Sequence, residues 1–198
     1  MPLQPAFTRE HPDERRQSLI EATARVLAER GAAGVSVRAI CAEAGVSPGL
    51  LRHYFSGVSD AIAQTYRWVG QSIAEALDAA VVRTGDSPRA RLLAYLTASF
   101  RPPIASSDLL ATYVAFWGLS RSDERVARVR SEVYSDYRSE LEGLIRAYRP
   151  DRGDPRLPAV ALTALIDGLW LELSLGKAPF TPEEAEALAE KWLDALLG

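Results

Sequence analysis

The sequence predicts an all-α protein of about nine helices, and three observations support this class. Apolar residues recur at intervals of three or four along most of the 198 residues. Proline and glycine separate these stretches, most clearly in the segment RPDRGDPR at 149–156. No stretch shows the alternation of a half-buried strand. A hydrophobic content of 47% is enough for a sizeable core in one or two small domains.

The segment SVRAICAEAGVSPGLLRHYF, residues 36–55, is predicted to form two short helices around a tight turn. Ser36 and Ser47 can each cap a helix, and Pro48 occupies a first helical position, where a missing N–H costs nothing. Gly45 supplies the positive φ that ends the first of the two helices. The second helix then runs from Pro48 to about Tyr54.

The outward face of this second helix is suited to the major groove of DNA. It combines an arginine, two polar aromatic residues and a glycine near the helix start, and consists of Gly49, Leu50, Arg52, His53 and Tyr54. Arginine can donate to guanine or phosphate, and leucine can touch a thymine methyl group. The pattern therefore indicates a DNA-binding helix-turn-helix. The alternative is an ordinary helical hairpin on the surface of an all-helical protein.

Six more helices are expected after this segment. The first of them ends near Gly85, and the second stops at Pro102-Pro103, because proline cannot continue a helix. The last begins with Thr181 as its cap and Pro182 in the first helical position. The expected ranges are 60–82, 88–100, 107–120, 123–148, 157–175 and 182–197.

From about Arg15 to Ala61 the sequence resembles the amino-terminal domain of TetR-family transcriptional regulators. Three pieces carry this resemblance in order: RRQSLIEATARVLAERG for a first helix, VSVR at 35–38, and AGVSPGLLRHYF. Three later pieces are similar to the BetI branch of the family, which contains a choline-responsive repressor: YVAFW at 113–117, LIDGLWL at 165–171 and AEKWLDALLG at 189–198. The resemblance implies a helix-turn-helix domain at 1–58 and a helical effector-binding and dimerisation domain at 59–198.

By position, the resemblance also implies the residues that contact operator DNA. They are Arg38, Ser47, Pro48, Gly49, Leu50, Arg52, His53 and Tyr54. One position departs from the family pattern, because Val58 stands where a lysine usually meets a phosphate. Ser59 is expected to cap the fourth helix, and Asp60 suits its amino-terminal dipole.

The charge distribution favours binding as a dimer. The net charge is −3, but residues 1–68 hold eight arginines against seven carboxylates and so carry +1, which leaves −4 for the remainder. Electrostatic affinity per subunit should therefore be modest, and two copies would be needed for tight binding.

The last two predicted helices are unusually apolar and are expected to form the homodimer interface. The resemblance implies that they build a four-helix bundle with a second copy. The residues assigned to this interface are Leu165, Gly168, Leu169, Trp192 and Leu196. The alternative is that both helices are buried within one chain.

Aromatic residues collect in the carboxy-terminal part and suggest a chamber for a small-molecule effector. Rings together with a carboxylate can hold a quaternary ammonium ion, and Asp167 and Glu172 flank Trp170 on an otherwise apolar helix. The candidate effector-binding residues are Phe100, Tyr113, Phe116, Trp117, Tyr137, Asp167 and Trp170. The resemblance implies choline or a related cation. A different small ligand, or rings that serve only as core, are the alternatives.

Several other functions are not expected. The two histidines, His11 and His53, stand apart, and no phosphate loop, catalytic triad or metal-spaced cluster accompanies them, so we expect no enzyme, no cofactor and no metal site. No apolar run reaches the length of a membrane helix and the start is not a signal peptide, which predicts a cytoplasmic protein. The predicted function is thus a ligand-released transcriptional repressor. The alternative is a helical ligand-binding or scaffold dimer with weakened DNA binding.

Overall fold

The computed structural model describes residues 12–198, and this part of the chain forms nine α-helices and one short 3-10 helix. The all-α prediction is confirmed; His11 lies outside the described residues. The elements are α1 (Pro12–Gly34), α2 (Val37–Ala44), α3 (Pro48–Tyr54), α4 (Val58–Val82), α5 (Pro88–Thr97), η1 (Ala98–Phe100), α6 (Ser107–Leu119), α7 (Glu124–Tyr148), α8 (Arg156–Ser174) and α9 (Pro182–Leu197).

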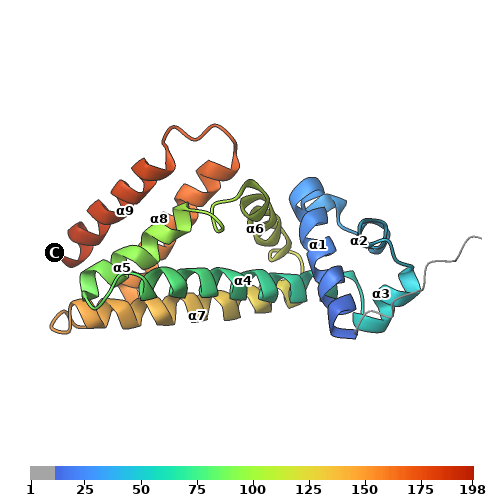
Figure 1. Ribbon diagram of the computed structural model, residues 1–198, viewed down its shortest axis with the longest axis horizontal. Helices are drawn as coiled ribbons and strands as arrows, with labels where there is room; N and C mark the ends of the chain where they lie inside the picture. The colour runs from blue at the N-terminus through green and yellow to red at the C-terminus, as the bar shows by residue number, and fades with distance from the viewer. Residues whose placement is uncertain (1–11) are drawn as a thin grey trace, which may run out of the picture.

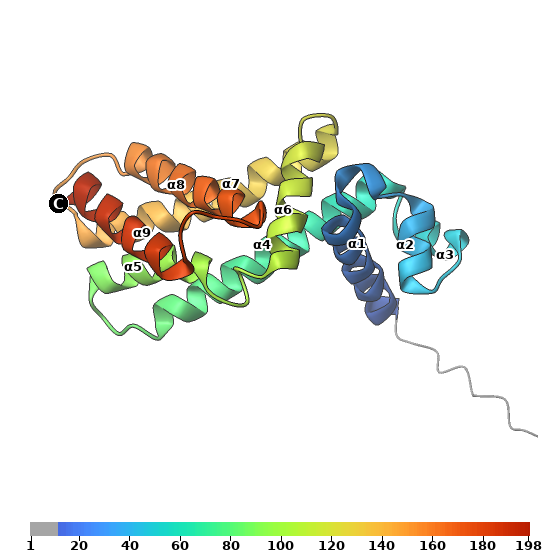
Figure 2. The same cartoon turned by 90° about the horizontal axis from the view of Figure 1, so that it is seen from above.

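The molecule is elongated, with α1 to α3 at one end and α5, α8 and α9 at the other (Figure 1). The long helices α4 and α7 lie side by side and connect the two ends (Figures 1 and 2). Helix α6 packs on α1 at the junction, while α8 packs on α6, α7 and α9. A displacement of α4 or α7 near α5, α8 and α9 can therefore be transmitted along these helices to α1, α2 and α3.

Two hydrophobic clusters form the core. The smaller cluster belongs to the three-helix end and the start of α4, and consists of Leu19, Ile20, Ile40, Cys41, Leu51, Phe55 and Ala61. The larger cluster fills the rest of the molecule and also includes Leu27 of α1. Val35, Val58 and Trp68 are partly buried and pack against both clusters. Helix α1 therefore contributes to both cores.

The start of α4 differs from the expectation. The helix begins at Val58, two residues early, and Ser59 does not cap it. Instead, Asp60 accepts a hydrogen bond from the backbone N–H of Ser56 at 2.8 Å and so satisfies the turn before the helix. Gly57 holds the N-cap position, so Ser59 lies inside the first turn, where its hydroxyl neighbours Asp123.

Helix α8 also differs from the expectation that no apolar stretch reaches membrane-spanning length. Among the described helices it alone meets that length and composition, with a mean hydropathy of 1.4. Its inner face, which includes Leu162, Ile166 and Trp170, is buried in the larger cluster. In all, 28% of this apolar stretch is buried, and its outer face stays exposed.

Candidate functional site

The turn between α2 and α3 is built by the side chains that the sequence indicated. The Ser36 hydroxyl accepts from the Ala39 N–H at 3.1 Å, and Gly45 adopts φ 65° and ψ 34° at the end of α2. Ser47 accepts from the Leu50 N–H at 3.4 Å, and Pro48 begins α3. Both helix starts are therefore satisfied locally, and the short α3 can present its outer face without help from a partner.

Helix α3 has one buried face and one free face. Leu51 is fully buried and Phe55, just after the helix, is 2% exposed, so both anchor α3 in the smaller cluster. The residues predicted to contact DNA all lie at least partly on the surface: Arg38, Ser47, Pro48, Gly49, Arg52 and His53 are exposed, and Leu50 and Tyr54 are half-buried. The His53 and Tyr54 rings meet edge to face, with centroids 5.0 Å apart. The exposed members thus include two arginines, Arg38 and Arg52.

Val58 lies at the boundary between the two hydrophobic clusters, which we call the seam. It is half-buried and packs against both hydrophobic clusters. An apolar side chain suits this position, because a lysine there would have to leave the seam to keep its charge in water.

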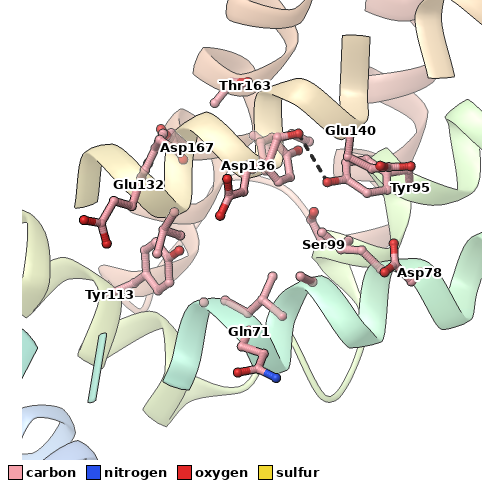
Figure 3. A pocket seen from close by; sticks show the side chains of 18 of the residues that line it. Gln71, Asp78, Tyr95, Ser99, Tyr113, Glu132, Asp136, Glu140, Thr163 and Asp167 are labelled. Carbon is pink, nitrogen blue, oxygen red and sulfur yellow. Dashed lines mark hydrogen bonds between the residues drawn. The ribbon is translucent and has the colours of Figure 1, made fainter. Parts of the chain in front are cut away.

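A cavity of about 490 Å³ lies in the carboxy-terminal part of the molecule. Most of its lining residues belong to α4 and α7, and the others come from α5, η1, α6 and α8. Gly70 lies at its edge, where a Cβ atom would come within 2.9 Å of both methyl carbons of Val133. The glycine therefore allows α4 and α7 to approach closely beside the cavity. Figure 3 shows Tyr113 and Asp167 at one end of this space, Tyr95 and Asp78 at the other, and Asp136 between them.

The wall of the cavity is strongly acidic. Five carboxylates line it: Asp78, Glu132, Asp136, Glu140 and Asp167. The cation among the lining residues is Arg67, which pairs with Glu132 at 2.7 Å. The lining residues thus carry a large excess of negative charge, and we expect the space to favour a cation.

Asp167 is the inner carboxylate of the cavity. Its Oδ2 accepts from the Tyr134 hydroxyl at 2.9 Å, and the Tyr134 hydroxyl accepts from Trp117 Nε1 at 2.9 Å. Burial raises the pKa of Asp167 to about 6, although the Tyr134 hydrogen bond and the charges of Arg130 and Arg138 act in the opposite direction. The carboxylate is therefore desolvated and fixed in direction, as a counter-ion for a bound cation would be.

Tyrosines surround this carboxylate. Burial raises the pKa of Tyr113, Tyr134 and Tyr137, so their hydroxyls stay protonated. The Tyr137 hydroxyl is buried without a hydrogen-bond partner in the described part of the chain, and Tyr137 lines the cavity. A ligand could satisfy it. Tyr113 meets Trp170 edge to face at 5.1 Å between centroids, and Trp170 Nε1 donates to the Ser99 carbonyl oxygen at 2.9 Å.

The structure brings together only part of the predicted effector set. Tyr113, Tyr137, Asp167 and Trp170 line the cavity. Phe100 and Phe116 are 1% and 0% exposed and do not line it; Phe116 instead stacks on Tyr66, with centroids 4.2 Å apart. Trp117 lines a separate, more open hollow that shares Asp167.

Glu172 points away from the cavity and is exposed. Five residues along a helix correspond to about 140° around its axis, so Glu172 and Asp167 cannot share a face. The sequence reasoning missed the other carboxylates, although Glu132, Asp136 and Glu140 follow one another at four-residue spacing on α7. That spacing places them on one face and could have identified them.

An apolar stripe remains uncovered on α8 and α9. Its large members are Leu157, Val160 and Leu171 on α8, Leu175 at the C-cap of α8, and Leu188 and Trp192 on α9. Gly168 lies on the exposed side of α8, and nothing would meet a Cβ atom there within 4 Å. The other predicted interface residues lie deeper: Leu169 is 9% exposed and belongs to the larger cluster, and Leu165 and Leu196 pack against that cluster.

Between residues 12 and 198, no three His, Cys, Asp or Glu side chains are grouped so that they could hold a metal ion. The free Cys41 is buried in the smaller cluster, and burial raises the pKa of its thiol.

Comparison with known proteins gives matches along most of the chain. Residues 19–57 match the model of bacterial regulatory proteins of the tetR family, and residues 88–198 match that of the carboxy-terminal domain of BetI-type transcriptional repressors. The HTH-type transcriptional regulator BetI of Burkholderia thailandensis is 33% identical over 187 residues, with 92% of this chain and 93% of the relative covered.

Solved structures share the fold. A transcriptional regulator from Pseudomonas aeruginosa PAO1 has a TM-score of 0.87 and 39% identity, with 97% of this chain and 94% of that chain covered. A regulator from Saccharomonospora viridis, solved in complex with choline, has a TM-score of 0.77 and 21% identity, with 92% and 96% covered.

Proposed function

The chain belongs to the TetR family of bacterial regulators and has a BetI-type carboxy-terminal domain, and from this premise we propose that it binds a palindromic operator as a homodimer and is released by a small cationic effector. It is a DNA-binding transcriptional repressor of the BetI type and not an enzyme. We further propose that residues 1–58 read DNA, that residues 59–198 bind the effector and form the dimer, and that the protein works in the cytoplasm, where bacterial operators lie.

The free face of α3 supports the assignment of DNA contacts. Arg52 and His53 are exposed and can reach base edges or phosphates, while Leu51 and Phe55 hold the helix from behind. Arg38 lies exposed on the neighbouring α2, where it can meet the flanking backbone. The combination of a fixed inner face and a free outer face on the tetR-type helix-turn-helix is the observation that carries the proposed function.

The uncovered stripe on α8 and α9 supports the homodimer. Exposed leucine and tryptophan side chains at helical spacing gain stability when a second copy covers them, and Gly168 lets another helix approach closely. For operator binding, a twofold axis through this stripe must place the two copies of α3 on one face of the dimer. Successive major grooves require them to be roughly 34 to 36 Å apart.

The acidic, aromatic cavity supports a cationic effector. A quaternary ammonium ion would gain the charge of Asp167 and the faces of the surrounding rings, which is the chemistry that recognises choline. The choline complex of the Saccharomonospora viridis relative is consistent with this class. A ligand that binds more tightly to a dimer with a different α3 spacing shifts the population away from DNA, by no more than its differential affinity for the two states.

The test is an operator titration with matched arginine variants. Footprinting on DNA next to the protein's own gene should reveal a protected palindrome, and Arg52→Ala should abolish protection while the dimer stays folded. Arg91→Ala is the control, because Arg91 is exposed on α5, far from α3. Unchanged protection with Arg52→Ala would overturn the assignment. A folded dimer that binds choline but protects no DNA would support the scaffold alternative.

A further inference from the structure

We propose that Arg125 is a positioning residue, which acts with Asp123, Ser56, Ser59 and Asp60 as a latch between α7 and the end of the recognition helix α3. The proposal rests on the proposed role of α3 in operator binding. In this proposal Arg125, which lies outside the helix-turn-helix, limits the motion of α3 and so affects operator affinity.

The first half of the latch ties Arg125 to the turn between α3 and α4. The Arg125 guanidinium donates to the Ser56 hydroxyl at 2.8 Å and lies 3.3 Å from Asp60 Oδ1. Ser56 in turn donates to Asp60 Oδ2 through its backbone N–H at 2.8 Å and its hydroxyl at 3.1 Å. Ser56 directly follows the buried Phe55, so α3 cannot turn without disturbing these bonds.

The second half ties the start of α7 to the first turn of α4. Asp123 caps α7 by accepting from the backbone N–H groups of Arg125 and Val126, at 2.9 and 3.1 Å. The Ser59 hydroxyl, in the first turn of α4, neighbours the same carboxylate and acts to lower its pKa. Two independent connections therefore join adjacent helix starts, and both involve side chains from α7 or its cap.

The position of α7 gives the latch a connection to the cavity. Glu132 lies seven residues beyond Arg125 on the same helix, about 10 Å along its axis. It lines the cavity and pairs with Arg67 of α4. Because a continuous helix moves as a stiff rod over two turns, a shift of α7 at the cavity also displaces Arg125 relative to the turn. The latch thus joins the ligand end of the molecule to α3.

A direct contact between Arg125 and a DNA phosphate is the competing role, because the arginine side chain is 48% exposed. Salt dependence separates the two roles. Loss of a phosphate contact lowers the slope of affinity against salt by about one per subunit, whereas loss of a positioning residue leaves the slope unchanged.

The experiment compares full-length dimers that carry Arg125→Ala, Arg125→Lys or Arg128→Ala. Arg128 is the matched control, because it lies one turn along the same helix, is exposed, and makes no ion pair or hydrogen bond with its side chain within residues 12–198. Hydrogen exchange of residues 47–58 is measured without DNA, and operator affinity is measured at several salt concentrations. Size-exclusion chromatography and thermal unfolding verify that all variants are equally dimeric and folded.

We expect Arg125→Ala to speed exchange in residues 47–58 and to weaken operator binding by roughly fivefold, with an unchanged salt slope. Arg125→Lys should restore part of both effects, and Arg128→Ala should match the wild type. Unchanged exchange and affinity would overturn the proposal. Unchanged exchange with a smaller salt slope would also overturn it, in favour of a phosphate contact. The exchange measurement needs no operator, so it decides on the latch even if the proposed operator binding fails.

Discussion

Replacement of Asp167 by asparagine should stabilise the ligand-free protein while removing its affinity for cations. Asp167 is a desolvated carboxylate whose pKa burial raises to about 6 from 3.8. The folded protein therefore favours the protonated form, and raising the pH from about 4 to about 6 removes stability through this group. Asp167→Asn keeps an oxygen that can accept from Tyr134 but carries no charge, so the variant escapes this loss.

The size of the effect follows from the pKa. Each pKa unit corresponds to about 1.4 kcal/mol, so the rise from 3.8 to about 6 sets an upper limit of roughly 3 kcal/mol at neutral pH. For a chain of this length, one kcal/mol shifts Tm by about 2 to 4 °C. We expect Asp167→Asn to raise Tm by at least about 3 °C above pH 7, and the advantage should vanish below about pH 4.

The assay is thermal unfolding with and without choline across this pH range. Choline should raise the Tm of the wild type most above pH 6, where Asp167 is ionised, and should not raise that of Asp167→Asn. Asp136→Asn is the control, because that carboxylate lines the cavity but is exposed. An unchanged or lowered Tm for ligand-free Asp167→Asn would refute the reasoning, since it would show that the carboxylate is already stabilised within the protein.

Three further predictions concern packing and assembly. Gly70→Ala should lower Tm by several degrees, because the new methyl group meets Val133 at 2.9 Å; adding Val133→Ala should recover most of the loss, and no recovery would contradict the close approach. Trp192→Glu should convert the dimer to monomers in analytical ultracentrifugation, whereas Lys191→Glu, at an exposed neighbouring position, should not. Ser36→Ala should lower the urea-unfolding free energy by about 1 kcal/mol through loss of the α2 cap, and an unaltered midpoint would argue against that cap.

Local chemistry made the helices predictable from the sequence. The caps at Ser36, Ser47 and Thr181 and the prolines that follow two of them determine where helices begin, through contacts within four residues. The prediction failed at the start of α4, which begins two residues earlier than the sequence indicated. Gly57 holds the N-cap position, so Ser59 lies inside the first turn and cannot cap the helix.

The cavity was less predictable, because its wall comes from five α-helices and η1. Residue type suggested aromatic rings, yet it could not show that Phe116 stacks inward on Tyr66 while Tyr137 faces the space. The acidic wall comes from charged residues that look like a solvated helix face until α4 lies beside α7. The sequence also could not show which apolar residues of α8 face outward, because this helix has two apolar faces. Leu169 belongs to the inner face.

Helix α1 has a consequence for the unfolding of the molecule. Ile20 belongs to the core behind α3, Leu27 belongs to the core around the cavity, and Thr112 of α6 donates to the Ala24 carbonyl oxygen between them at 3.3 Å. Neither core is complete if this helix melts. The proposed DNA-reading and ligand-binding parts should therefore not be independently stable. Heat should unfold both parts in one cooperative transition, and residues 1–58 alone would expose Leu27 to water.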